Sequence, residues 1–108
     1  MTAPTVAAAP GRVAAPAVEV VAAGVQTTVQ DLPGRSGLWG VGVPPSGAWD
    51  DRSFTLANLA VGNDPGAAGL EAVLRGPVLR FPAWALVCVT GAVAAATLDG
   101  RPVRAGVP

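Results

Sequence analysis

Short runs of apolar and β-favouring residues, separated by turn signals, follow one another along much of the chain. The first two cover residues 18–22 and 27–30, and we expect them to pair with each other across Ala23-Gly24. From residue 70 apolar and polar positions alternate over residues 70–75, and an apolar run at residues 85–90 is typical of a fully buried strand. The pattern therefore predicts a mainly antiparallel β unit, in a small barrel or sandwich.

The Asp99-Gly100 pair predicts a tight hairpin near the end of the sequence. Both residue types tolerate the positive φ angles that a type I′ turn requires. The turn would join a strand at residues 94–98 to one at residues 102–103, and a further strand is expected at residues 78–81.

One segment carries a helical pattern instead. Asp50 or Asp51 is the expected N-cap, because its carboxylate can accept from the unpaired N–H groups of the first turn. The helix would run through residues 54–60 and stop at Gly62, a residue suited to the left-handed position after a helix. Residues 63–66 would form the exit turn.

Between the second strand and this helix lies a loop, residues 32–49, that contains five glycines and three prolines. Glycine allows positive φ angles and close approach of the backbone, and proline fixes φ. Four polar side chains, Arg35, Ser46, Asp50 and Asp51, lie at the edges of the loop. We expect so stiff a loop to position a ligand.

Length and composition limit the class of protein. The 108 residues allow one domain, and we expect residues 1–17, rich in alanine and proline, to be a disordered leader or linker before a domain over residues 18–108. Seven arginines, scattered along the chain, balance seven acidic residues, so the sequence offers no basic patch for a nucleic acid. We interpret the uncharged residues 81–98 as two buried strands rather than a membrane span, and expect a soluble, cytoplasmic protein.

The residue types also restrict the chemistry. The absence of histidine excludes a Ser-His-Asp triad, and with one cysteine and scattered carboxylates no metal site is expected. Cys88 lies in an apolar run and is interpreted as a buried thiol. What remains is the junction of loop and helix, where free N–H groups and the helix dipole favour a negative charge.

Several separated motifs follow one another: TVQDLPGR at 28–35, VGVPPSG at 41–47, LAN at 56–58, VGN at 61–63, GLE at 69–71, GP at 76–77, LRF at 79–81 and TGA at 90–92. In this order they resemble the start of the biotin-dependent carboxyltransferase domain, which occurs in urea carboxylase, urea amidolyase, allophanate hydrolase subunit 2 and the C subunit of 5-oxoprolinase. Pro33 and the Leu38-Trp39 pair are most similar to the urea carboxylase branch, whereas Trp49 and Leu59 depart from the family pattern.

The resemblance implies a cyclophilin-like β-barrel, of which this chain is an incomplete, amino-terminal part. It implies transfer of CO2 from carboxybiotin to urea, with biotin carried on another domain and ATP used only by a separate domain or subunit. The implied partners are a small amide such as urea, a biotinyl domain, and the missing second half of the domain or a partner subunit. The alternatives are a component of a 5-oxoprolinase, which hydrolyses a cyclic amide with ATP, a non-catalytic partner-binding module, or a truncated product without activity.

Within this interpretation, the junction residues receive roles. Ser46 and the Gly47 amide would donate to an oxyanion, and Asp50 would hold the acceptor nitrogen or assist its deprotonation, unless it only caps the helix. Arg35 would orient a carboxylate or carbonyl of the substrate, with a salt bridge to Asp31 as the alternative.

Two residues outside the loop are also candidates. Asn58 is expected to face outward from the apolar helix and bind an amide, and the alternative is a hydrogen bond to the backbone of the next loop. Glu71 lies on the minority face of its strand and is expected to pair with Arg75 or Arg80.

Overall fold

The computed structural model describes residues 5–8, 17–92 and 95–108, and this part of the chain is mainly β. In chain order the elements are β1 (Thr5–Ala8), β2 (Glu19–Ala22), β3 (Gln26–Gln30), the 3-10 helix η1 (Trp39–Val41), α1 (Asp51–Ala60), β4 (Gly69–Val73), β5 (Val78–Arg80), β6 (Val87–Thr90), β7 (Thr97–Leu98) and β8 (Arg101–Pro102). The predicted mainly-β class with one short α-helix is confirmed for the described residues. Their strands form separate sheets and do not close into a barrel, so the cyclophilin-like barrel stays a prediction.

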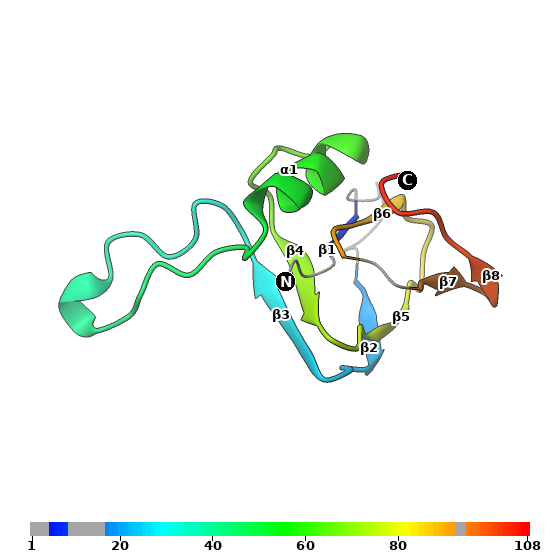
Figure 1. Cartoon of the computed structure of the whole chain (residues 1–108), viewed down its shortest axis with the longest axis horizontal. Coiled ribbons are helices and arrows are strands. Elements are labelled where there is room, and N and C mark those ends of the chain that lie inside the picture. The colour runs from blue at the N-terminus through cyan, green and yellow to red at the C-terminus, as the bar shows by residue number, and fades with distance from the viewer. Residues whose placement is uncertain (1–4, 9–16, 93–94) are drawn as a thin grey trace.

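The central sheet has the strand order β3-β4-β1-β6, and all of its neighbouring strands are antiparallel. β2 and β5 form a second, two-stranded sheet, and β7 and β8 form a hairpin. α1 packs against β1 and β6, and the loop before it projects from this body as a long arm (Figure 1).

The predicted pairing of the first two strands is wrong, because β2 pairs with β5 and β3 pairs with β4. The chain bends at Gly24 between β2 and β3, and at Leu74 between β4 and β5, with positive φ angles of 71° and 65°. A hydrogen bond of 3.1 Å from Val25 N to Arg75 O joins the two bends. One antiparallel ribbon is thereby folded across two sheets, and strands that are neighbours in sequence lie in different sheets.

Strand β1 corrects the expected extent of the leader. Thr5–Ala8 lies between β4 and β6, with Val6 opposite both Leu70 and Val89. β-branched residues favour strands, and β1 satisfies backbone groups that would otherwise lie at two open sheet edges. The expectation of a disordered leader therefore does not hold for these four residues, and the rest of residues 1–16 lie outside the described residues.

The predicted helix is confirmed, with its cap and its end. Asp50 is the N-cap of α1, and Gly62, just after the C-cap, has a φ of 81°. The core beneath the helix contains Phe54 and Cys88, both fully buried, so the predicted buried thiol is confirmed. Packing of this apolar face on β1 and β6 fixes where the start of α1, and the arm before it, lie on the sheet.

The predicted Asp-Gly hairpin is also confirmed. Asp99 and Gly100 have φ angles of 50° and 78°, as a type I′ turn requires, and Leu98 pairs with Arg101 across it. Its first strand begins at Thr97, later than expected. Among the described residues, no helix has the length and apolar character needed to cross a membrane.

Candidate active site

The glycine- and proline-rich loop, residues 32–49, forms the arm that projects from the body in Figure 1. Its tip is η1, where Trp39 and Val41 are 70 % and 75 % exposed. Its root, where both limbs reach the body, is held by Leu32 N, which donates to Gly66 O at 3.1 Å, and by Trp49 N, which donates to Glu71 Oε2 at 2.8 Å. Among the polar residues singled out in the sequence, Asp50 and Glu71 lie at this root rather than at the tip.

The two limbs of the arm come together just above the root. Arg35 N donates to Pro45 O at 2.5 Å. A side-chain carbon on Gly34, which has a φ of 87°, would collide with the same carbonyl oxygen, so glycine is required there. Ser46 and Gly47 follow with φ angles of 50° and 95° and turn the second limb toward α1.

Asp50 ends this limb and caps α1. Its Oδ1 accepts from Ser53 N at 3.0 Å. Hydrogen bonds from the Ser53 side chain and backbone, with a smaller contribution from Arg52, lower the pKa of the Asp50 carboxyl below its usual value of 3.8. The carboxylate therefore stays ionised at neutral pH, where it is a good hydrogen-bond acceptor and a weak base.

Glu71 is the residue at the root whose role the sequence did not reveal. It lies at the centre of β4, only 6 % exposed, and its Oε2 binds the Trp49 amide. The expected pairing with an arginine is wrong, because Arg80 binds Glu19 on the surface at 3.1 Å and Arg75 forms no ion pair among the described residues. A buried acidic residue in a strand is the signal that could have marked Glu71, since burial of a charge requires a partner.

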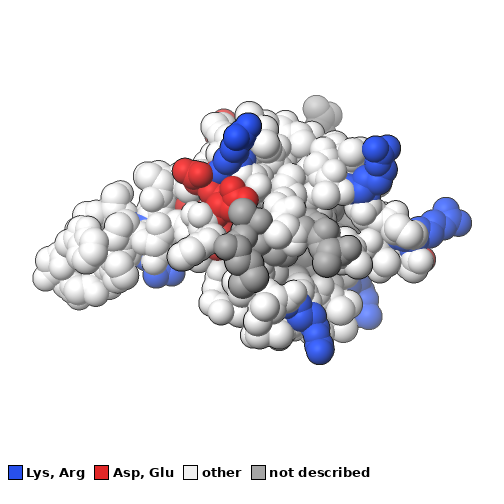
Figure 2. Space-filling view, viewed as in Figure 1, with Lys and Arg blue, Asp and Glu red and all other residues white. Residues whose placement is uncertain are grey.

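The two carboxylates change the electrostatic character of the site. Asp50 takes the Ser53 N–H at the helix start, and Glu71 takes the Trp49 N–H one residue before Asp50. Figure 2 shows acidic side chains gathered on the surface close to the start of α1, and Asp51 adds a third carboxylate there. The expected attraction of an anion to this helix start stays a prediction, and the ionised Asp50 carboxylate also offers an acceptor to a ligand that carries N–H groups.

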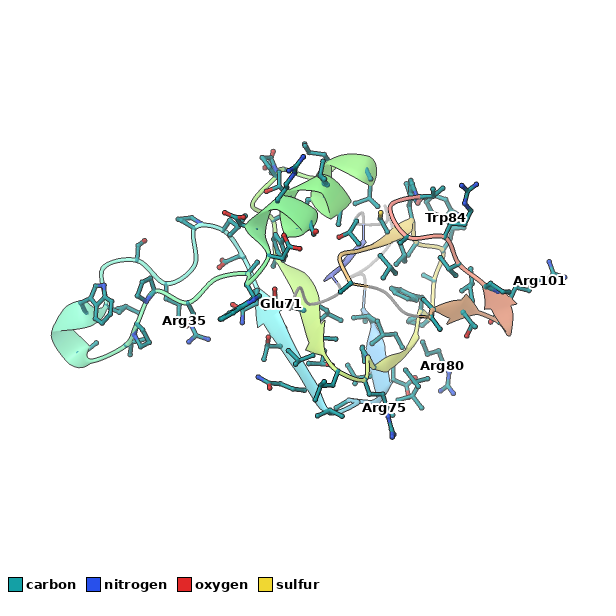
Figure 3. All side chains as sticks on the ribbon, viewed as in Figure 1. Arg35, Glu71, Arg75, Arg80, Trp84 and Arg101 are labelled. Carbon is teal, nitrogen blue, oxygen red and sulfur yellow. The ribbon has the colours of Figure 1, made fainter. Side chains whose placement is uncertain are left out.

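Donors remain on the arm itself. Ser46 is exposed, and Gly47 N makes no hydrogen bond that involves the described residues. Arg35 is also exposed and lies along the arm, whereas Glu71 lies on the body (Figure 3). Within the described part of the chain Arg35 has no ion pair, so its alternative role as a partner of Asp31 is not observed.

Asn58 does not lie at the site. It is fully buried, and its Nδ2 donates to Pro65 O at 3.2 Å and to Ala67 O at 2.9 Å. Its Oδ1 accepts from Asn63 Nδ2 at 3.2 Å. The expected outward-facing amide binder is therefore wrong, and Asn58 instead fixes the exit turn to α1, as the alternative had it.

Comparison with known proteins identifies the family. The sequence model of the carboxyltransferase domain, subdomain A and B, matches residues 41–108, which include the second limb of the arm, α1 and the strands after it. The chain belongs to this carboxyltransferase family. The resemblance inferred from the separated motifs is thereby confirmed.

Individual relatives lie in two groups. The chain is 45 % identical over 92 residues to urea amidolyase of Lachancea kluyveri, and the aligned region covers 85 % of this chain and 5 % of that protein. It is 44 % identical over 87 residues to a putative urea carboxylase of Emericella nidulans, covering 81 % of this chain and 7 % of that protein. It is 38 % identical over 89 residues to the 5-oxoprolinase C subunit of Escherichia coli, covering 82 % of this chain and 28 % of that protein. No solved structure matches the chain.

In this carboxyltransferase-family chain, therefore, the candidate site is the root of the arm. Ser46, Gly47 and Asp50 follow one another on the second limb of the arm, and the Trp49 amide between Gly47 and Asp50 binds Glu71 of β4. Among the described residues, no group of three or more histidine, cysteine or acidic side chains is arranged to hold a metal ion. The arrangement is suited to bind and orient a polar substrate with both donor and acceptor groups.

Proposed function

We propose that this chain is the amino-terminal part of a carboxyltransferase that transfers a carboxyl group from carboxybiotin to urea and so forms allophanate. The observation that carries the proposal is that the chain has a higher sequence identity to one group of relatives than to the other. Three urea amidolyases and urea carboxylases are 45 %, 45 % and 44 % identical to the chain, whereas two 5-oxoprolinase C subunits are 38 % identical. The chain spans 5 % of the urea amidolyases and 28 % of the Escherichia coli protein, so the complete reaction requires parts that this chain does not contain.

The donors at the root fit the cofactor that this activity needs. Biotin would be carried on another domain, and ATP would be used by a separate domain or subunit. When bound, carboxybiotin supplies the carboxyl group and takes back the proton that urea loses, at the ring nitrogen that releases the carboxyl group. The exposed Ser46 hydroxyl and the Gly47 N–H would donate to its oxygens, because neither donor is engaged within the described residues.

The acceptors at the root fit urea. Urea presents N–H donors, and an ionised carboxylate forms stronger hydrogen bonds with N–H groups than a neutral acceptor does. Ser53 N donates to Asp50 Oδ1, and a carboxylate can accept several hydrogen bonds, so Asp50 would also accept from a urea nitrogen. Because its pKa is lowered, Asp50 would orient this nitrogen rather than remove its proton.

The test compares Asp50 variants in the complete enzyme, assembled with its biotin carboxylase and biotinyl domains. Asp50→Ala is expected to lower the rate of urea carboxylation about 100-fold or more, since positioning effects of this kind are large. Asp51→Ala, at the exposed neighbouring carboxylate, is the matched control and is expected to stay within about threefold of wild type.

Two results would contradict the proposal in different ways. Normal turnover by Asp50→Ala would remove Asp50 from substrate binding. A wild-type enzyme that hydrolyses ATP and carboxylates biotin, but forms no allophanate from urea, would refute the assignment of the acceptor.

A 5-oxoprolinase component is the second candidate, and the identity of 38 % to two C subunits supports it. 5-Oxoproline also carries an amide N–H that a carboxylate such as Asp50 would accept. ATP-dependent opening of 5-oxoproline without biotin, by this chain with its partner subunits, would establish this candidate in place of urea carboxylation.

A further inference from the structure

Glu71 is an acidic side chain that is almost fully buried in the sheet, where a charge needs a partner. It is 6 % exposed and forms no ion pair among the described residues. In the sheet it lies opposite Thr28, whose hydroxyl accepts from Gln30 Nε2 at 3.1 Å. Burial of a carboxylate is unfavourable unless it forms hydrogen bonds, so the bond from Trp49 N to Glu71 Oε2 is the interaction that offsets this cost.

The second limb of the arm has few other attachments to the body. The first limb is held by the backbone bond from Leu32 N to Gly66 O. Residues 46–49 of the second limb include two positive φ angles, and the Trp49 side chain is 78 % exposed, so it adds little packing. Within the described part of the chain, the bond to Glu71 is the hydrogen bond that fixes this limb to the sheet.

We propose that Glu71 is a latch, a positioning residue that holds residues 46–49 against β4 and so sets where Gly47 and Asp50 meet the substrate. The inference rests on the proposed function for its consequence in the reaction, and on the structure for the latch itself. Glu71 lies 22 residues after Trp49 in sequence, so the latch ties the arm to a strand that follows α1 in the chain.

The latch also determines which backbone N–H groups at the root are available to a ligand. With its amide bound to Glu71, the Trp49 backbone offers no donor to a ligand, and Gly47 N is a donor of this limb that no described residue engages. Loss of the latch would release a competing N–H beside Asp50 and let the limb rotate about Ser46 and Gly47. Both effects would disturb the orientation of a substrate without removing a group that touches it.

Hydrogen exchange of the Trp49 amide, measured by NMR on the full chain, tests the latch without any assay of activity. Glu71→Met keeps the length of the side chain and removes its acceptor, and we expect exchange at Trp49 to become about 10-fold to 100-fold faster. Glu71→Gln retains a neutral acceptor, and we expect a smaller increase of about threefold. The amides of Val25 and Asn63, bound within the body, are expected to exchange as in wild type.

Glu19→Gln is the matched control, because it makes the same substitution at an exposed carboxylate on β2 that binds Arg80. It is expected to leave Trp49 exchange unchanged. Equal acceleration at Trp49, Val25 and Asn63 in the Glu71 variants would overturn the latch, because Glu71 would then support the whole fold. Wild-type exchange at Trp49 in a folded Glu71→Met or Glu71→Gln variant would overturn it as well.

The consequence for the reaction is measured in the complete enzyme. We expect Glu71→Met to lower kcat for urea carboxylation about tenfold, with the KM for ATP at the separate carboxylase unchanged, and Glu71→Gln to restore most of the rate. Faster exchange at Trp49 with unchanged kcat would confine the latch to structure and overturn its positioning role. A wild-type enzyme without urea carboxylation would instead refute the proposed function, while the exchange result would still decide the latch.

Discussion

Asn58 offers the sharpest test of whether a conspicuous polar residue of this chain serves the fold or the substrate. It is fully buried in α1, and it makes three hydrogen bonds, two to carbonyls of the exit turn and one from Asn63. At roughly 0.5 to 1.5 kcal/mol each, these bonds sum to about 3 kcal/mol. Pro65 is exposed, so water can replace part of the loss at its carbonyl, whereas Ala67 is half-buried. We therefore expect Asn58→Ala to lower the free energy of unfolding by about 2 kcal/mol.

The measurement is guanidinium unfolding of the full chain at neutral pH, followed by circular dichroism. Asn58→Asp should be more destabilising than Asn58→Ala, by about 1 kcal/mol or more, because its carboxylate would face two carbonyl oxygens. Leu59→Ala, at a side chain 54 % exposed on the same helix, is the control and should change stability by about 0.5 kcal/mol or less. If Asn58→Ala is as stable as wild type but its complete enzyme loses activity, the structural role is refuted and a substrate contact is favoured.

Three further predictions concern groups around the core and the cap. The pKa of Asp50 is lower in the folded chain than its ordinary value of 3.8, so its charge stabilises the fold above that pH and ceases to do so as the pH falls through the folded pKa. The difference in stability between wild type and Asp50→Asn, measured by thermal unfolding, should therefore be constant from about pH 5 to 8 and shrink below about pH 4. Burial raises the pKa of the Cys88 thiol and leaves it inaccessible, so alkylation should be at least about 100-fold slower in native buffer than in denaturant, and rapid native labelling would contradict the packed core. Thr90→Val removes the hydroxyl that donates to Ser53 O at 2.7 Å while it keeps the shape, and should cost about 1 kcal/mol of unfolding free energy; an unchanged midpoint would show that this bond does not hold α1 to β6.

Features fixed by neighbouring residues could be predicted from the sequence. The cap at Asp50, the helix end at Gly62 and the Asp99-Gly100 turn each depend on the geometry of a few consecutive residues. Most of the strands after residue 17 can also be located, to within a few residues, from β-favouring and apolar runs and from alternation of apolar and polar positions. Local signals of this kind are independent of which strands finally pair.

Features fixed by distant residues could not. The pairing of β2 with β5 depends on the bends at Gly24 and Leu74, which are joined only when the ribbon is formed. β1 has no signal stronger than two β-branched residues, and it becomes a strand because β4 and β6 leave room for one between them. Attraction between opposite charges predicts an arginine as the partner of Glu71, but its partner is a backbone amide, which composition cannot reveal.

The same limit explains the change in the electrostatic argument for the site. A helix that starts after a glycine-rich loop has free N–H groups, and that fact alone predicts attraction of an anion. Here the Ser53 N–H is taken by Asp50 within the same turn, and the Trp49 N–H just before the helix is taken by Glu71 from a strand that follows the helix. Asp50 thereby adds an ionised acceptor at the helix start, and under the proposed function this acceptor would bind an N–H group of urea. The positive φ angles at Ser46 and Gly47 turn the second limb of the arm toward α1, so the arm contributes by setting the path of the chain into the helix.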